Sequence, residues 1–449
     1  MSKQQLAAIL EMSAQNPPPA NATPAEMRAW IEGVTGQLPV AENVQIERVT
    51  CGPCDGELIS PAGGDASRLI ILYHGGGFFF GSSRTHRVIA SNLARAAGCA
   101  VLMPDYHLAP ENPAPAAHDD AFAVYRWALS QGYAPGKVAL YGDSSGGNLA
   151  LATAVRAKDA GLPQPGALAL ASPWLDVARE GASHQGTPDD PVVSAELLDL
   201  FTHCYLGDGD RKSPAVTPFH ADFSGLPPTL VHVGTRERLH DDSVTVVERM
   251  KAAGVAAELQ IFDGMTHNWQ LYAPILDEGM ASVEACAAFI KANTTKDAKT
   301  LLLEFLAAVT HGQDAAALFA EDGAVELPFL HSVGIPWRHQ GRQAISELQD
   351  QLAGLYQGFG FPPEETHVLI DTPGQVFAEY MAHPTAAATG RTVHNLFTAR
   401  LVAENGEIKL LQESLNPLAA AQALLPGGVK DLPDPEKVIF SVAPDYRSR

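Results

Sequence analysis

Between residues 46 and 293, short runs of consecutive apolar residues alternate with longer segments whose apolar positions recur every three or four residues. The short runs predict strands buried on both faces, and the longer segments predict helices that cover them. The predicted strands are 67–73, 100–104, 138–141, 167–171, 229–233 and 257–262, and the predicted helices are 85–97, 116–131, 241–253 and 280–292. The pattern predicts an α/β fold with a mostly parallel central sheet, preceded by a hairpin at 45–51 and 56–60.

The remaining segments follow other patterns. Residues 1–45 predict amphipathic helices that Asn16-Pro-Pro-Pro19 interrupts, and the polar segment 294–298 predicts a linker. After the linker, helices are predicted first and strands afterwards: helices 299–310, 315–319 and 341–356, then strands 367–371, 375–383, 392–403 and 407–416. This order predicts a separate, smaller α+β domain at 299–425 with an antiparallel meander. Residues 426–449 are rich in proline and charge, and we expect an extended arm.

The composition narrows the class of protein. A chain of 449 residues is long enough for two or three domains, and its net charge of −21 disfavours nucleic acid and anionic membranes as partners. The N-terminus lacks the apolar core of a signal peptide and no run is long enough to span a bilayer, so a cytoplasmic location is expected. The five cysteines indicate no disulfide framework, and the spacing of Cys51 and Cys54, although typical of redox motifs, is interpreted as incidental.

A G-x-S-x-G motif carries the strongest chemical signal. It runs from Gly142 to Gly146, directly after the predicted strand 138–141 and before a segment of helical pattern. In this context the motif is typical of a nucleophile elbow, in which a sharp turn exposes the serine hydroxyl above a helix N-terminus. Only Ser144 satisfies the pattern, because a register on Ser145 would put Asp143 where the first glycine belongs.

Further motifs stand where an ester hydrolase needs them. His74-Gly-Gly-Gly77 follows the strand that ends at Tyr73, and three glycines let bare backbone N–H groups approach a developing oxyanion. An acidic segment, Glu237 to Asp242, follows strand 229–233, and Gly264-Met-Thr-His267 follows strand 257–262. The chain order of serine, acid and histidine is that of α/β-hydrolases.

Together with Tyr106-His-Leu-Ala-Pro-Glu-Asn-Pro113, these motifs resemble the hormone-sensitive-lipase-like family of α/β-hydrolases, the bacterial family IV esterases, over residues 1–293. The resemblance implies Ser144 as nucleophile, His267 as general base, and the N–H groups of Gly76, Gly77 and Ser145 as oxyanion donors. The family's usual aspartate aligns with Glu237, which we expect to be the acid of the triad, with Asp241 and Asp242 as fallback acids. His107 and Ser145 replace the usual Arg and Ala. No metal or organic cofactor is implied.

The family builds a cap from its N-terminal helices and from an insert, here residues 1–45 and about 177–225. The resemblance implies that the cap lines the acyl and alcohol pockets. Candidate walls of these pockets are Phe78, Phe79, Trp174, Phe201 and Trp269.

Residues 299–425 are similar to the SnoaL-like, NTF2-like superfamily of cone-shaped domains. The similarity rests on the segments 318–325, 377–380 and 406–413. Leu327, before Pro328, occupies the place where ketosteroid-isomerase-like members carry their aspartate base, so we expect a role in dimer formation or in access to the esterase site. Polar groups that would line a pocket in such a domain are His331, Trp337, His339, Glu379, His394 and Glu413.

The sequence thus predicts a serine carboxylesterase for short- to medium-chain acyl esters. A lactonase is the nearest alternative, because a lactone is a cyclic ester that opens by the same steps. A ligand-binding receptor on a hydrolase scaffold is an alternative from another class, and the presence of His267 argues against it. A third possibility is a bifunctional chain whose second domain has its own isomerase or cyclase activity.

Overall fold

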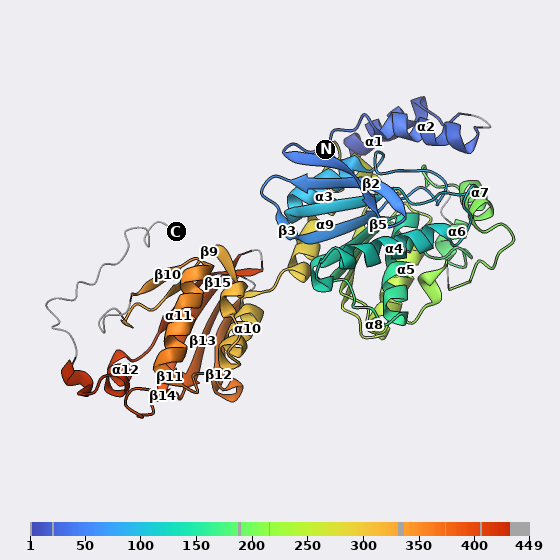
Figure 1. The fold of residues 1–449 in the computed structure, drawn as a ribbon. Coiled ribbons are helices and arrows are strands. Elements are labelled where there is room, and N and C mark those ends of the chain that lie inside the picture. Colours follow the sequence, from blue (N-terminus) through green and yellow to red (C-terminus); the bar gives the residue numbers. More distant parts are fainter. Residues whose placement is uncertain are drawn as a thin grey trace. The chain divides into compact units, whose positions relative to one another are not determined.

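The computed structural model describes residues 2–19, 22–186, 190–214, 216–330, 336–372, 374–404 and 406–431. The chain divides into two compact units, Met1–Thr294 (unit 1) and Thr295–Arg449 (unit 2) (Figure 1). Each unit has its own central sheet and its own hydrophobic core. No helix in the described ranges combines the length and the apolarity needed to cross a bilayer.

Unit 1 is built on an eight-stranded sheet in the order β1-β2-β4-β3-β5-β6-β7-β8. Its strands are β1 Val44–Cys51, β2 Cys54–Pro61, β3 Asp65–Tyr73, β4 Cys99–Pro104, β5 Val138–Asp143, β6 Ala167–Ala171, β7 Thr229–Gly234 and β8 Ala257–Phe262. The strands from β4 onward in this order pair in parallel, whereas β2 pairs antiparallel with both β1 and β4. The predicted mostly parallel sheet with a leading hairpin is confirmed.

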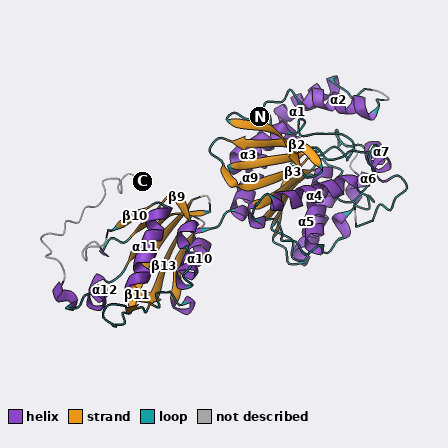
Figure 2. Ribbon diagram, in the orientation of Figure 1, coloured by secondary structure: helices purple, strands orange, loops and turns teal. Residues whose placement is uncertain are grey.

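Helices cover both faces of this sheet (Figure 2). The main covering helices are α3 Arg87–Ala97, α4 Ala116–Ser130, α5 Ser145–Asp159, α8 His240–Ala252 and α9 Asp277–Thr294, with 3-10 turns η1 Pro135–Lys137, η2 Pro218–His220 and η3 Trp269–Tyr272. Strand β3 shows why both faces must be covered, because Leu69 and Ile71 belong to the core under α4 and α5, whereas Ile70 and Leu72 belong to the core under α3 and α9. Successive strand residues point to opposite faces, and here both sets are apolar.

The predicted cap segments form the helices α1 Ser2–Gln15, α2 Pro24–Thr35, α6 Ala182–Gly186 and α7 Ala195–Leu206. Helix α2 begins with a capping box between Thr23 and Glu26. Its Arg28 donates to the carbonyl oxygens of Phe79 and Ala109, at 2.9 and 2.8 Å, and so fixes α2 to the loops after β3 and β4. Helix α1 packs Leu6 and Ile9 against the segment that follows β8.

Unit 2 has a six-stranded sheet in the order β10-β9-β16-β15-β13-β12 and a separate pair of short strands. Its strands are β9 Phe319–Glu326, β10 Arg338–Gln340, β11 Tyr356–Gln357, β12 Thr366–Thr372, β13 Gln375–Ala382, β14 Thr385–Ala386, β15 Asn395–Glu404 and β16 Glu407–Ser414. Its helices are α10 Ala298–Thr310, α11 Arg342–Leu355 and α12 Pro417–Leu424, with 3-10 turns η4 Ala315–Leu318, η6 Pro363–Glu365 and η7 Gly428–Asp431.

The order of elements in unit 2 differs from the prediction. Two strands, β9 and β10, precede α11, the predicted helix 315–319 is the 3-10 turn η4, and the helix α12 follows the last strand. Strand β9 follows η4 directly and pairs in parallel with β16, so a strand precedes α11 and the sheet is not a pure antiparallel meander. The sequence of β9, Phe-Ala-Glu-Asp-Gly-Ala-Val-Glu, has polar residues and glycine at its centre, which conceal the strand pattern. Residues 432–449 of the predicted arm lie outside the described residues, and 428–431 form a turn.

Candidate active site

The serine elbow has the geometry that its motif predicts. Ser144 directly follows β5 and has a φ of 52° and a ψ of −121°, a strained conformation for a residue with a side chain, and α5 begins at the next residue. A Cβ at Gly142 would lie 2.1 Å from the carbonyl oxygen of Gly146, and a Cβ at Gly146 would lie 1.9 Å from that of Tyr73. Both glycines of the motif are therefore required for the turn to close.

The His74–Gly77 loop lies beside this elbow. Gly75 N–H donates to Asp143 Oδ1 at 3.1 Å, and Phe78 N–H donates to Ser145 Oγ at 3.3 Å. Within the described residues, the N–H groups of Gly76, Gly77 and Ser145 have no hydrogen-bond acceptor. Three unengaged amides beside a serine hydroxyl are what the stabilisation of an oxyanion requires.

The predicted acid and base are in direct contact. His267 Nδ1 lies 3.0 Å from Glu237 Oε2, and both side chains are buried. The other carboxylate oxygen of Glu237 accepts hydrogen bonds from Ser172 Oγ at 2.8 Å and from Gly234 N–H at 2.6 Å. Glu237 is thereby fixed on the strand ends of the sheet and holds the ring of His267 in one orientation.

The pKa of His267 responds to two opposed effects. Burial disfavours the imidazolium, but the hydrogen bond and the negative charge of Glu237 outweigh burial and hold the pKa above its usual value. The imidazolium that forms when the ring takes a proton is thus stabilised by Glu237.

Asp143 joins the serine loop to the histidine loop. Its buried carboxylate accepts hydrogen bonds from Gly75 N–H and, at 2.8 Å, from Asn268 Nδ2, and it lies 3.2 Å from His86 Nε2. Burial raises its pKa, but the charges of the surrounding histidines prevail and lower it. Because Asn268 follows His267 and Asp143 precedes Ser144, this bond brings the nucleophile and the base to the same edge of the sheet.

The fallback acids have other partners. Asp241 accepts a hydrogen bond from Ser183 N–H at 2.8 Å, and Asp242 lies 2.6 Å from His184 Nε2. Asp242 also accepts the backbone N–H groups of Leu175 and Asp176. Both aspartates therefore hold the start of the cap insert.

One buried group in the described ranges could offer ligands to a cation. Ligand atoms of Asp176, His184 and Asp242 lie within 4.8 Å of one another. His184 and Asp242 already pair, and Asp176 Oδ2 accepts the backbone N–H of Glu180. Through these hydrogen bonds, Asp176, His184 and Asp242 anchor the cap to the rest of unit 1. The three residues have no role in the reaction proposed below.

Four of the five predicted pocket aromatics form one cluster beside the glycine loop. Phe78 lies 5.9 Å from Trp174 and Phe79 lies 5.9 Å from Phe201, measured between ring centroids. The ring of Phe201, on cap helix α7, lies directly against Gly77, where an added Cβ would come within 2.1 Å of it. An acyl chain held by the oxyanion loop would therefore meet Phe201.

The structure does not place Trp269 with these residues. Trp269 is fully buried in a separate cluster with Leu6, Ile9, Met265 and Leu276, and its indole N–H donates to the carbonyl oxygen of Glu278 at 3.1 Å. Its nearness to His267 in sequence suggested a pocket wall, but η3 turns the ring away into the core beneath α1.

Some site residues were not predicted from the sequence. Tyr205 of α7 stacks on Phe78 at 4.2 Å, and its hydroxyl lies 2.7 Å from His118 Nδ1. His118 Nε2 lies 2.9 Å from Asn148 Oδ1, so a buried polar chain links the cap to the helix below Ser144. Two polar residues could have indicated this chain from the sequence. They are His118, in the Pro-rich segment after Tyr106, and Asn148, in the first turn of α5.

Cys51 and Cys54 face each other across the β1–β2 hairpin as free thiols. Burial, the largest cause, raises the pKa of the Cys51 thiol to about 12 and that of Cys54 further. Thiols that stay protonated are poor nucleophiles, which agrees with the interpretation of this spacing as incidental.

Comparisons with known proteins show the fold and the family that this chain is similar to. Residues 70–271 match a family model described as the alpha/beta hydrolase fold. An acetyl-hydrolase of Streptomyces hygroscopicus is 41% identical over 253 residues, which are 56% of this chain and 84% of that protein. An esterase of Acinetobacter venetianus is 35% identical over 283 residues, covering 63% of this chain and 93% of that protein.

A solved structure is similar over the same extent. The crystal structure of an esterase from the bacterial hormone-sensitive lipase family aligns with a TM-score of 0.63 and 39% identity, covering 65% of this chain and 98% of that one. The similarity therefore spans nearly the whole of the relative and leaves about a third of this chain unmatched in that alignment.

Proposed function

This chain is a carboxylic ester hydrolase of the bacterial hormone-sensitive-lipase-like family, which has the α/β-hydrolase fold, and on that premise we propose that Ser144, His267 and Glu237 are its catalytic triad. The observation that carries the proposal is the buried contact of His267 Nδ1 with Glu237 Oε2 at 3.0 Å, at the strand edge that also bears Ser144. The esterase and hydrolase names of the similar proteins favour an enzyme over a receptor.

The proposed reaction runs through an acyl-enzyme. His267 Nε2 takes the proton of Ser144 Oγ as that oxygen attacks the ester carbonyl, and Glu237 stabilises the resulting imidazolium. The carbonyl oxygen becomes an oxyanion held by the N–H groups of Gly76, Gly77 and Ser145. Collapse of the intermediate expels the alcohol, which takes its proton from His267. Water, deprotonated by His267, then releases the acid from Ser144.

The cap suggests the size of the acyl group. Phe201 and Phe79 stand against the glycine loop, and helix α7 fixes Phe201 in place. We therefore propose esters with short to medium acyl chains. Lactones stay the second candidate, because ring opening uses the same groups.

The chain-length preference is testable with p-nitrophenyl esters. We expect kcat/KM to be highest for acetate, butyrate or hexanoate and to fall at least tenfold by laurate, since a long chain must displace Phe201. Release of p-nitrophenol reports each rate, and a pH-stat assay with γ-butyrolactone tests the lactonase alternative in parallel. Equal rates for acetate and laurate would contradict the proposed acyl pocket, and no hydrolysis of any ester would contradict the proposed function.

For unit 2 we propose an NTF2-like cone fold and a role in homodimer formation. Its sheet ends at β12, an edge strand whose Leu369 and Ile370 are 56% and 57% exposed. Exposed apolar residues on an edge strand favour pairing with another copy. We expect light scattering to give twice the chain mass for the full chain and a single mass for a chain ending at Thr294. A full-length chain with the mass of a monomer would contradict the proposed homodimer.

We also propose a cytoplasmic location for the chain, which cell fractionation tests.

A further inference from the structure

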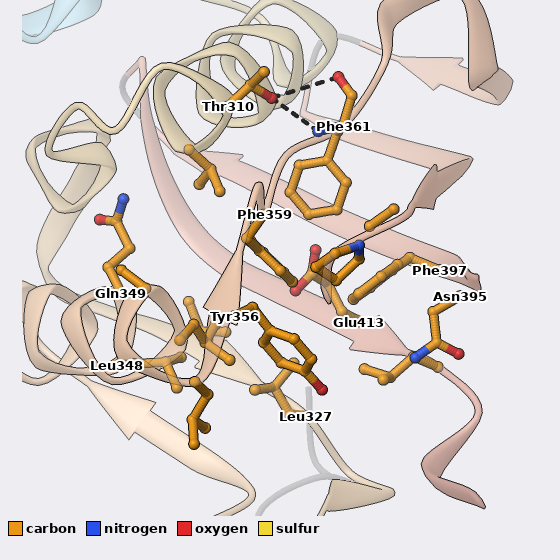
Figure 3. Close-up of a pocket in the computed structure, with 18 of the residues that line it drawn as sticks. Thr310, Leu327, Leu348, Gln349, Tyr356, Phe359, Phe361, Asn395, Phe397 and Glu413 are labelled. Atoms are coloured by element: carbon orange, nitrogen blue, oxygen red, sulfur yellow. Dashed lines mark hydrogen bonds between the residues drawn. The ribbon is translucent and has the colours of Figure 1, made fainter. Parts of the chain in front are cut away.

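Unit 2 contains a cavity of about 550 Å³ between its sheet and its helices. The inward-facing residues of β15 and β16, such as Phe397 and Glu413, line one side, and Leu348 of α11 lines the other (Figure 3). Phe305 of α10 also belongs to the lining. This volume lies within the range of cavities that enclose drug-sized ligands, roughly 300–1,000 Å³. The cavity belongs to unit 2 alone and has no part in the ester hydrolysis proposed above.

The walls are mostly apolar and well fixed. Phe361 packs edge-on against Phe397 and Phe359, with ring centroids 5.4 and 5.5 Å apart. The N–H of Phe361 donates to Thr310 Oγ1 at 2.9 Å, which ties this loop to the end of α10 (Figure 3). An apolar cavity with fixed aromatic walls suits an apolar ligand, because it needs little rearrangement on binding.

Among the described residues, one buried acid lies inside this apolar lining. Glu413 is 7% exposed, and its carboxyl group stands among the rings of Phe359, Phe361 and Phe397 (Figure 3). Its Oε1 accepts a hydrogen bond from the hydroxyl of Tyr380, which is the one partner of this carboxyl among the residues that the structure describes. The carboxyl thus keeps one oxygen without a protein partner in the lining of the cavity.

The other predicted polar groups in the described part of the chain do not line this cavity. Glu379 and His394 are absent from its lining, as are Trp337 and His339, and His331 lies outside the described residues. Leu327, at the position of the missing aspartate base, does line it. Glu413 is therefore the acid around which a ligand would bind.

The protonation of Glu413 sets its hydrogen-bonding role. Burial raises the pKa of Glu413 to about 7, despite the hydrogen bond from Tyr380, and burial holds the pKa of Tyr380 well above its usual value. Since Tyr380 donates to Oε1, the proton of a neutral Glu413 is free to be donated from the other oxygen.

We propose that this cavity binds a neutral, largely apolar small molecule that bears one carbonyl or ether oxygen, and that Glu413 donates a hydrogen bond to that oxygen. The aromatic and aliphatic lining supplies the affinity, and the acid supplies the orientation. An anionic ligand is disfavoured by the acid, and a strongly polar one by the walls.

The other ionisable groups that line the cavity differ from Glu413 in pKa or in exposure, so Glu413 is the group whose titration the pH series tests. Tyr356 lines the cavity, but burial raises its pKa to about 12, so it stays neutral at the pH values of the test. Asp314 and Asp350 also line the cavity, on η4's N-terminal side and on α11, and both are exposed. The strand residue opposite Glu413 on β15 is Ala399, which carries no charge.

The binding test uses the full chain and the probe 6-propionyl-2-(dimethylamino)naphthalene, a neutral fluorophore with one ketone oxygen. We expect saturable binding at one site, with emission shifted to shorter wavelength. Leu352→Trp, which fills the cavity from a partly exposed position on α11, should weaken binding at least tenfold. Leu303→Trp, at an exposed position on α10 outside the cavity lining, is the matched control and should bind as the wild type does.

The same titration at different pH values tests the acid. Binding should weaken about tenfold from about pH 6 to about pH 8, as the neutral fraction of Glu413 falls. Glu413→Gln keeps the shape and a donor but cannot titrate, so its affinity should not change over this range. Circular dichroism and melting temperature verify that each variant is folded.

Each result decides the matter. Absence of saturable binding, or equal loss of affinity in Leu352→Trp and Leu303→Trp, would overturn the proposed site. A wild-type affinity independent of pH, or the same pH dependence in Glu413→Gln, would overturn the role of Glu413. The readout is independent of ester hydrolysis, so failure of either proposal leaves the other standing.

Discussion

Ser144→Ala is expected to lower kcat for p-nitrophenyl butyrate by about 10⁵–10⁶-fold, to the level at which only binding and the oxyanion donors remain. The variant removes the single atom that forms the acyl-enzyme and leaves the glycine loop and His267 in place. Hydrolysis is followed by p-nitrophenol absorbance, with the enzyme at high concentration so that residual activity is measured.

Ser145→Ala is the matched control for this loss. Ser145 Oγ accepts a hydrogen bond from Phe78 N–H at 3.3 Å, but its proposed role in catalysis uses its backbone N–H, which alanine also has. We expect this variant to keep activity within about tenfold of the wild type, since one neutral hydrogen bond contributes about 1 kcal/mol. If Ser145→Ala lost the activity and Ser144→Ala kept it, the assignment of the nucleophile would be wrong.

Glu237→Gln is expected to lower kcat by about 10⁴-fold, the scale measured when a triad acid is replaced by its amide. Glutamine fills the same space, but it cannot stabilise the imidazolium of His267 with a negative charge. Asp241→Asn is the control, because Asp241 accepts a hydrogen bond from Ser183 N–H that asparagine can also accept. We expect this control to lose little activity, and the reverse ranking would refute the assignment of the acid.

The pH profile of Glu237→Gln gives a second readout. His267 works as a base only when neutral, so activity falls as the pH drops through its pKa, which Glu237 holds above the usual value. Without that charge, the two largest effects that raise the pKa of His267 are lost, while burial still lowers it and the more weakly acting charges of Asp190 and Asp143 still raise it. The acidic limb of the kcat/KM profile should therefore move to lower pH in the variant, and an unmoved limb would contradict the role of Glu237.

The strands of unit 1 could be predicted because a strand buried on both faces requires apolar residues at every position. Residues 69–72 of β3 are all apolar and lie between two layers of helices, so burial on both faces and the apolar run have the same cause. The elbow could be predicted for a steric reason, since only glycine fits at Gly142 and Gly146.

Contacts that close over long distances in sequence could not be predicted. The bond between Asn268 and Asp143 joins residues 125 positions apart, and neither residue has a pattern that names the other. Trp269 shows the opposite failure, because its position beside His267 suggested the pocket, whereas packing against α1 decides its direction.

In unit 2, the sequence predicted most of the secondary structure but did not single out the residue at the cavity. The helices α10 and α11 and the strands β12, β13, β15 and β16 follow from periodicity, whereas the helix α12 was not predicted. Strand β9 is concealed by its polar residues and forms because β16 offers a partner. Glu413 was one of six candidate polar residues, and only the geometry of the cavity distinguishes it from the others.

The most direct test of the central claim is intact-mass analysis after treatment with a fluorophosphonate, which reacts with activated serine nucleophiles. The account predicts that the wild type and Ser145→Ala each gain the mass of one phosphonyl group, that Ser144→Ala gains none, and that peptide mapping finds the group on Ser144. Equal labelling of Ser144→Ala, or a label on another residue, would contradict the account.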